Sequence, residues 1–226
     1  MKWALLIGVV VLTACRPHPP AAPVRKTSLG LEIEYLELGN GLKVVIVEDP
    51  RATQIQVTMR YRVGAVDDPA GQEGMAHLVE HLMFQQVLGG QSLFDQLENT
   101  TSSFNGVTSL DATTYLSRAT RDRLDKLLSI EAVRVGFRCT TITDATFDRE
   151  REVVINELRQ REPKSAVYLA VQRGIYPVGH PYARPTSTEA ALRTITRDQA
   201  CAFADAHYTT GNSVLVVSGD LTKQLV

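Results

Sequence analysis

The sequence lacks basic runs, repeats and long apolar segments, and each absence narrows the possible classes of protein. With a formal net charge of −1 and no cluster of lysine and arginine, nucleic acid is not an expected partner. The main apolar run, residues 3–12, is too short for a comfortable membrane span. The composition is otherwise ordinary for a soluble globular protein, with 44% hydrophobic and 22% charged residues. A chain of 226 residues is long enough for one domain with a sizeable core.

The first residues have the pattern of an export signal. Lys2 precedes the apolar run, and the small residues after that run end at Cys15. Residues 12–15, Leu-Thr-Ala-Cys, resemble the lipobox of bacterial lipoproteins, which implies lipidation of Cys15 and the membrane as a partner. Arg16, in place of an aspartate, favours sorting to the outer membrane in that class. We therefore predict a lipid-anchored protein on the periplasmic face of the bacterial cell envelope. The alternative is an ordinary signal peptide with an incidental cysteine.

The sequence divides into three segments. A signal peptide at residues 1–15 is followed by a proline-rich tether at residues 16–30 and by a single domain at residues 31–226. Two further cysteines, Cys139 and Cys201, lie within this domain. An exported protein could oxidise them to a disulfide, but they show no spacing pattern, and both could equally be small buried side chains.

Histidine is also scarce, and two of the five histidines belong to one short motif. On a helix, His77 and His81 lie one turn apart on the same face, with Glu80 beside them. Two neutral imidazoles suit Zn²⁺, and the adjacent carboxylate is placed to take a proton from an attacking water. The order His-x-x-Glu-His is the inverted form of the zinc-protease helix motif. The alternative is a helix whose polar groups are solvated, or partly buried, without a metal.

Hydrophobic periodicity predicts an α+β domain with helices packed on a mainly antiparallel sheet. Strands come first, then helices, and a final apolar strand closes the domain. A proline at position 163 predicts the end of a helix just before it. The predicted strands are residues 42–47, 55–63, 102–108, 113–119 and 213–218, and the predicted helices are residues 72–87, 92–98, 122–136, 143–161, 165–176 and 197–207.

A catalytic zinc site usually takes three protein ligands, so a third ligand must come from elsewhere in the sequence. The other histidines are poor candidates, because they lie in the tether, in a proline-flanked loop and at a helix end. In the predicted helix at residues 143–161, Glu150 and Glu157 share one face and Glu152 points elsewhere. One interpretation makes Glu157 the ligand and Glu150 a carboxylate that orients an imidazole. The other is a surface helix whose acids pair with its arginines, and the residues alone favour neither.

Together these residues resemble the M16 peptidase family, the inverzincins that include pitrilysin, insulin-degrading enzyme and the mitochondrial processing peptidase. The family signature is His-x-x-Glu-His followed about 75 residues later by a glutamate, and Glu157 stands at that distance from His81. Glu150 matches an acidic residue that the family has two turns before this ligand. Residues 105–115 resemble the family segment Asn-Ala-x-Thr-x-x-Asp-x-Thr-x-Tyr, with Gly106 in place of the usual alanine. The similarity extends over residues 31–226.

The resemblance implies a single M16-type metallohydrolase domain with one Zn²⁺ per chain. It assigns the metal to His77, His81 and Glu157, and it makes Glu80 the general base of a metalloendopeptidase. It further implies that Asn105 hydrogen-bonds a peptide substrate near the scissile bond. The peptide would add as a strand to an edge of the sheet.

Members of this family pair such a domain with a second, similar domain that supplies an arginine and a tyrosine for substrate binding. No residue of this sequence can be assigned those roles, so we expect a second M16-type domain or subunit as a partner. The favoured function is therefore half of a zinc metalloendopeptidase. The alternatives are a non-catalytic subunit that binds peptides or a sister subunit, and a metal-binding lipoprotein in zinc handling. The intact set of motif residues favours the peptidase.

Overall fold

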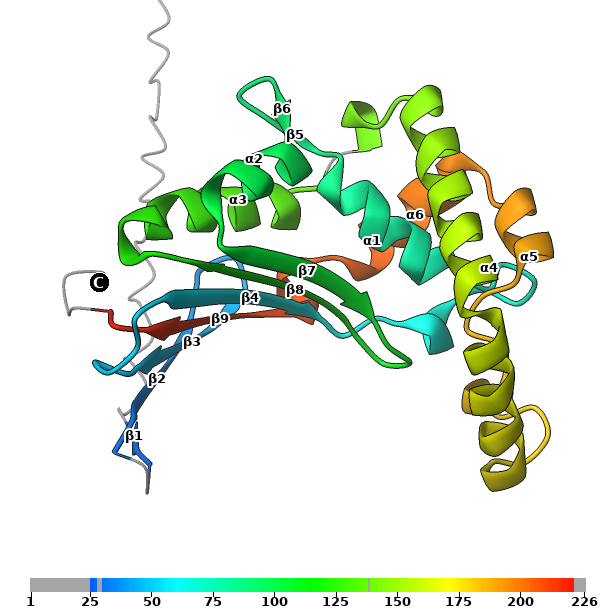
Figure 1. Cartoon of the computed structure of the whole chain (residues 1–226), viewed down its shortest axis with the longest axis horizontal. Coiled ribbons are helices and arrows are strands. Elements are labelled where there is room, and N and C mark those ends of the chain that lie inside the picture. Colours follow the sequence, from blue (N-terminus) through cyan, green and yellow to red (C-terminus); the bar gives the residue numbers. More distant parts are fainter. Residues whose placement is uncertain (1–24, 28–29, 138, 222–226) are drawn as a thin grey trace, which may run out of the picture.

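A seven-stranded sheet forms one layer of the domain, and helices cover one of its faces (Figure 1). The computed structural model describes residues 25–27, 30–137 and 139–221. The strand order is β1-β2-β3-β9-β4-β8-β7, and all neighbours in it are antiparallel except the pair β3–β9. The predicted α+β class is therefore confirmed. The strands are β1 (Arg25–Lys26), β2 (Glu32–Glu37), β3 (Lys43–Glu48), β4 (Ile55–Tyr61), β7 (Ser103–Thr108), β8 (Thr113–Ala119) and β9 (Ser213–Gly219), with a separate two-stranded ribbon of β5 (Val87–Leu88) and β6 (Gln91–Ser92).

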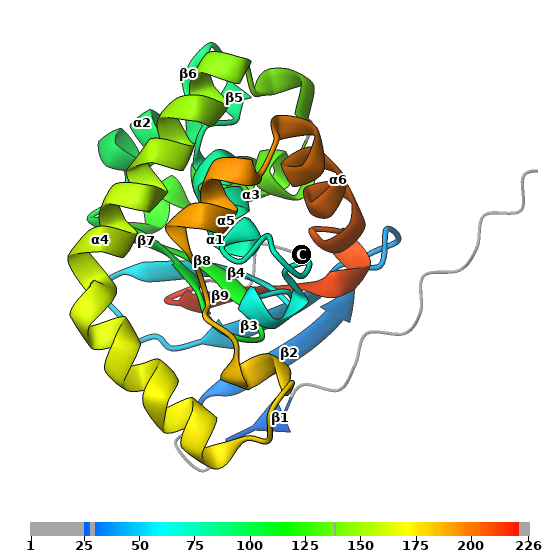
Figure 2. The ribbon, with the colours of Figure 1, turned by 90° about the vertical axis from the view of Figure 1, so that its right-hand side faces the viewer.

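Helices α1, α2, α3 and α6 lie over the same face of the sheet, and α4 runs past one side of it (Figure 1). Figure 2 shows α4 along the edge of the domain with the short helix α5 next to it. This arrangement brings α4 against α1, the helix that carries the histidine motif. The α-helices of the described residues are α1 (Met75–Phe84), α2 (Leu93–Thr100), α3 (Leu124–Val135), α4 (Asp144–Ile175), α5 (Glu189–Thr194) and α6 (Arg197–His207).

Side chains that alternate along the central strands form the floor of the core. In β4, Ile55, Val57, Met59 and Tyr61 are at most 1% exposed, as the predicted period of two requires. Helix α1 covers this floor with a fully buried apolar stripe. Burial of each such side chain contributes about 1.5–3 kcal/mol, so the motif helix is held firmly on the sheet. The stripe consists of Met75, Leu78, Val79, Leu82 and Met83.

The motif helix is shorter than predicted at both ends. We expected residues 72–87, but α1 covers Met75–Phe84. At its start, Gly74 adopts a left-handed conformation that cannot belong to the helix interior. At its end, the chain leaves the helix after Gln85 and enters the β5–β6 ribbon. Helix α5, which has only six residues, was not predicted.

Helix α4 is continuous, so the predicted break before Pro163 is wrong. A proline removes one backbone hydrogen bond and favours a kink or an end at that point. Here turns on both sides of the proline make tertiary contacts that a break in the helix would disturb. Arg159 forms two hydrogen bonds with Glu189 of α5, and Arg173 donates to the carbonyl of Ala183.

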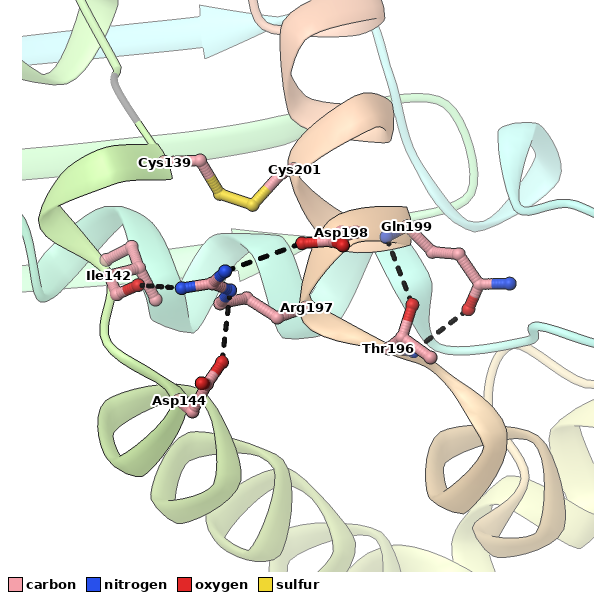
Figure 3. Close-up of a disulfide and its surroundings, with 8 residues drawn as sticks. All are labelled: Cys139, Ile142, Asp144, Thr196, Arg197, Asp198, Gln199 and Cys201. Carbon is pink, nitrogen blue, oxygen red and sulfur yellow. Dashed lines mark hydrogen bonds and ion pairs between the residues drawn. A yellow bond between two sulfur atoms is a disulfide. The ribbon is translucent and has the colours of Figure 1, made fainter.

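A disulfide joins Cys139, just before α4, to Cys201 in α6 (Figure 3). The sequence left the state of these cysteines open, and the structure pairs them with a Cα–Cα distance of 5.5 Å. Arg197 of α6 reinforces this link, because it donates to the carbonyl of Ile142 and pairs with Asp144 at 3.2 Å. The start of α4 is thus tied to α6, which packs on α1.

The predicted signal peptide and most of the tether lie outside the described residues. The predictions for residues 1–15, including lipidation of Cys15, are therefore not addressed by the fold. In the part of the chain that the structure describes, no helix is both long enough and apolar enough to cross a membrane.

Candidate metal centre

The start of α1 is fixed by a buried aspartate and a glycine. The carboxylate of Asp68 accepts hydrogen bonds from the backbone N–H groups of Gly74 (2.7 Å) and Ala76 (2.8 Å). Gly74 has a φ of +106°, and a Cβ at this position would lie 2.6 Å from the hydroxyl oxygen of Ser187. A side chain there would displace the first turn of the helix, and with it the histidines that follow.

The structure brings His77, His81 and Glu157 together. Glu157 Oε2 lies 3.7 Å from His77 Nε2, and its Oε1 lies 3.7 Å from His81 Nε2. One donor atom from each residue can be chosen so that all lie within 4.8 Å of one another. Glu152, on the same helix, instead pairs with Arg193 of α5, as its predicted orientation requires.

The chemistry of these donors fits a Zn²⁺ ion. Burial, reinforced by His81 and Arg161, lowers the pKa of His77 to about 3, so its imidazole is neutral at pH 7. A neutral imidazole offers the lone pair that a metal needs, and the separation of 3.7 Å from Glu157 exceeds a hydrogen bond. Two ligands at about 2.0–2.1 Å from a tetrahedral ion lie about 3.4 Å apart. Each imidazole lies 3.7 Å from one oxygen of Glu157, which is close to this value, while the set of one donor atom per residue extends to 4.8 Å.

Glu150 lies on the opposite side of the His81 ring from Glu157. Its Oε2 is 3.5 Å from His81 Nδ1, whereas Glu157 approaches the Nε2 atom of the same ring. Glu150 is only 6% exposed, and it accepts a hydrogen bond from Arg149 Nε. Glu150 thus lies near the ring nitrogen of His81 that faces away from Glu157.

Glu80 is buried beside this group and is held by a neighbouring strand. Its side chain accepts a hydrogen bond from Thr108 Oγ1 at 2.6 Å, and its backbone carbonyl accepts one from the hydroxyl of Tyr115. Burial raises the pKa of Glu80, while the bond from Thr108 and the nearby His81 oppose that rise. A carboxylate whose pKa is raised binds a proton more readily, which suits a general base.

A cleft of about 760 Å³ opens in front of these residues. It is bounded on one side by α4 and on the other by the edge strand β7, whose exposed Asn105 contributes to the lining. The other histidines of the described residues take no part. His180 stacks on Tyr176 and His207 packs on Phe203.

Sequence reasoning missed two partners of the site. Arg161 forms an ion pair with Glu157 at 2.8 Å, one helical turn further along α4. The two interpretations of this helix are therefore compatible, because Glu157 faces the imidazoles and also pairs with an arginine. The i,i+4 spacing signalled this pair. The bond from Thr108 to Glu80 had no local signal, because it joins residues on different elements.

Comparison with known proteins gives a consistent result. The sequence pattern of the insulinase family, peptidase family M16, matches residues 43–180. The zinc protease PqqE of Helicobacter pylori is 30% identical over 202 residues, which cover 85% of this chain and 44% of that protein. Subunit beta of the mitochondrial-processing peptidase of Neurospora crassa is 26% identical over 205 residues, covering 87% of this chain and 42% of that subunit. The crystal structure of a protease from Helicobacter pylori superposes with a TM-score of 0.78 at 29% identity, covering 86% of this chain and 48% of that one.

The fold and the grouped side chains thus define a domain of the zinc-protease class. The chain belongs to peptidase family M16, as its motifs predicted. It spans less than half the length of the relatives described above.

Proposed function

We propose that this chain is the metal-binding half of a zinc metalloendopeptidase of the inverzincin type, which hydrolyses peptides or unfolded polypeptides. One observation supports this above all. Two imidazoles and the carboxylate of Glu157 converge at a cleft whose wall contains a second, buried carboxylate, Glu80. These are the residue types, in the sequence order, that a peptidase of this family uses.

Each residue of the group has a distinct role in this proposal. His77, His81 and Glu157 hold one Zn²⁺ per chain. When bound, the ion lowers the pKa of water to about 7 and polarises the carbonyl of the substrate. Glu80 takes the proton from the attacking water and delivers it to the leaving amine. Glu150 keeps the ring of His81 in the orientation that metal binding needs.

The peptide substrate would bind along β7. This strand is the last in the sheet order, so among the described residues no further strand pairs with its outer edge. It also lines the cleft in front of Glu80. An extended peptide can add to such an edge through main-chain hydrogen bonds, and Asn105 on this strand would bond to it near the scissile bond.

A second M16-type domain or subunit is part of the proposal. The relatives are about twice as long as this chain, which covers 42–48% of them. A second half would close the cleft and supply further groups that bind the substrate. The residues of that half are not present among those described.

The experiment measures zinc content and cleavage on the same preparations. We expect one zinc per chain, together with hydrolysis of a quenched fluorescent peptide that is strongest when a candidate second M16-type subunit is added. A non-catalytic subunit would bind the peptide without cleaving it under either condition. A zinc-handling protein would exchange its metal readily and show no cleavage with any partner. Either of these results would contradict the proposal.

We also propose that the mature protein is anchored in the bacterial cell envelope through a lipid on Cys15. Cells grown with labelled palmitate should incorporate the label into the wild-type protein and lose it in Cys15→Ser. The double variant Cys139→Ser/Cys201→Ser serves as a control and should keep the label, because its changes lie in the folded domain. Label that persists in Cys15→Ser would refute the anchor.

A further inference from the structure

The buried carboxylate of Glu80 is held by the edge strand rather than by its own helix. Thr108 of β7 donates its hydroxyl to Glu80 Oε2 at 2.6 Å, and this bond spans 28 positions of the sequence. Because Glu80 is only 6% exposed, solvent cannot replace this donor fully. The direction in which the carboxylate points is therefore set largely by Thr108.

The same strand makes room for the other carboxylate oxygen. A Cβ at Gly106 would lie 2.6 Å from Glu80 Oε1 and 2.8 Å from Cε2 of Phe84. Both distances are shorter than real Cβ contacts, so a methyl group at this position would require the end of the Glu80 side chain and the ring of Phe84 to shift. Gly106 therefore lies in close contact with Glu80, but it does not fix the direction of the carboxylate, since the related family usually has alanine at this position.

Successive side chains of β7 point to opposite faces of the sheet. Gly106 lies opposite Tyr115 and Thr108 lies opposite Thr113, two residues whose side chains are buried toward the helices. Asn105 lies next to Gly106 in the strand, so its side chain points to the opposite face of the sheet. Among the described residues no further strand pairs with the outer edge of β7, so its main chain can bond to a peptide.

We propose that Thr108 is a positioning residue for the general base, so that the strand which receives the peptide also sets the direction of Glu80. This inference rests on the proposed function for its kinetic consequence. Its structural part concerns the chain alone, because the hydrogen bond and the close approach involve only the chain's own residues. The two parts are therefore tested separately.

The first test is a double-mutant cycle on the metal-free protein. Thr108→Val should lower the melting temperature by about 4–8 °C, because a buried carboxylate loses its donor. In the Glu80→Ala background the same change should have almost no effect. Thr114→Val, on the adjacent strand, is the matched control and should shift the melting temperature little in either background. Equal losses from Thr108→Val in both backgrounds would overturn the proposal.

The second test is kinetic and uses the zinc-loaded chain. Thr108→Val should lower kcat by about 10- to 100-fold, because the base is misplaced by a fraction of an ångström to an ångström. KM and the zinc dissociation constant should change less than about twofold, and Thr108→Ser should restore most of kcat. Unchanged kcat in Thr108→Val would overturn the positioning role. If the wild type does not cleave peptides at all, the proposed function fails, and the melting cycle alone decides whether Thr108 holds Glu80.

Discussion

Glu80→Gln is expected to lower kcat for peptide hydrolysis by about 10²- to 10⁴-fold while zinc stays bound. The amide has nearly the same shape as the carboxylate and can still accept the hydrogen bond from Thr108. It cannot take a proton from water, so the loss should appear in kcat and not in zinc content. The measurement is peptide cleavage, with metal analysis of the same samples.

The matched control for this variant is Glu98→Gln. Glu98 lies on α2 and is exposed, so its loss should leave both zinc content and kcat unchanged. Full activity of a zinc-loaded Glu80→Gln protein would reject the role of Glu80 as the base. Loss of zinc from that variant would instead show that Glu80 contributes to metal binding.

Glu157→Gln is expected to weaken zinc binding by more than about 100-fold. Mutation of a residue that only supports a metal ligand typically costs about 10- to 100-fold, and loss of a ligand should cost more. The reason is that Glu157 is the only anionic member of the group whose donor atoms lie within 4.8 Å of one another. Its neutral amide is a poor ligand beside two neutral imidazoles. The dissociation constant can be measured by competition with a chromogenic chelator.

Two substitutions on the same helix provide a graded comparison. Glu150→Gln should weaken zinc binding by about 10- to 100-fold, because it disturbs the orientation of His81 without removing a ligand. Glu152→Gln should have no effect, because its side chain pairs with Arg193 away from the cleft. A different ranking of the three variants, above all wild-type affinity in Glu157→Gln, would contradict the assignment of ligands.

Much of the fold followed from local patterns. The alternation of apolar residues that begins at Ile55 predicted a strand, and β4 forms there. Ser92 accepts the hydrogen bond that caps the start of α2. The helix break predicted at position 163 is wrong, since α4 continues through the proline and turns on both sides of it make tertiary contacts. The disulfide between Cys139 and Cys201 could not be predicted, because no spacing rule relates two cysteines on separate elements.

Some residues of the site could likewise be related from the sequence, and others were brought together only by the fold. The sequence by itself determined that His77 and His81 share one face of a helix, since helical geometry relates residues four positions apart. It also supplied Glu157 as a candidate, first through the helix face that it shares with Glu150 and then through a family signature, without placing it. Only the tertiary structure decided that α4 lies against α1, so that Glu157 faces the imidazoles, and that β7 supplies the donor to Glu80. The physical reason is that backbone geometry relates neighbouring residues, whereas distances between separate elements depend on how their buried faces pack together.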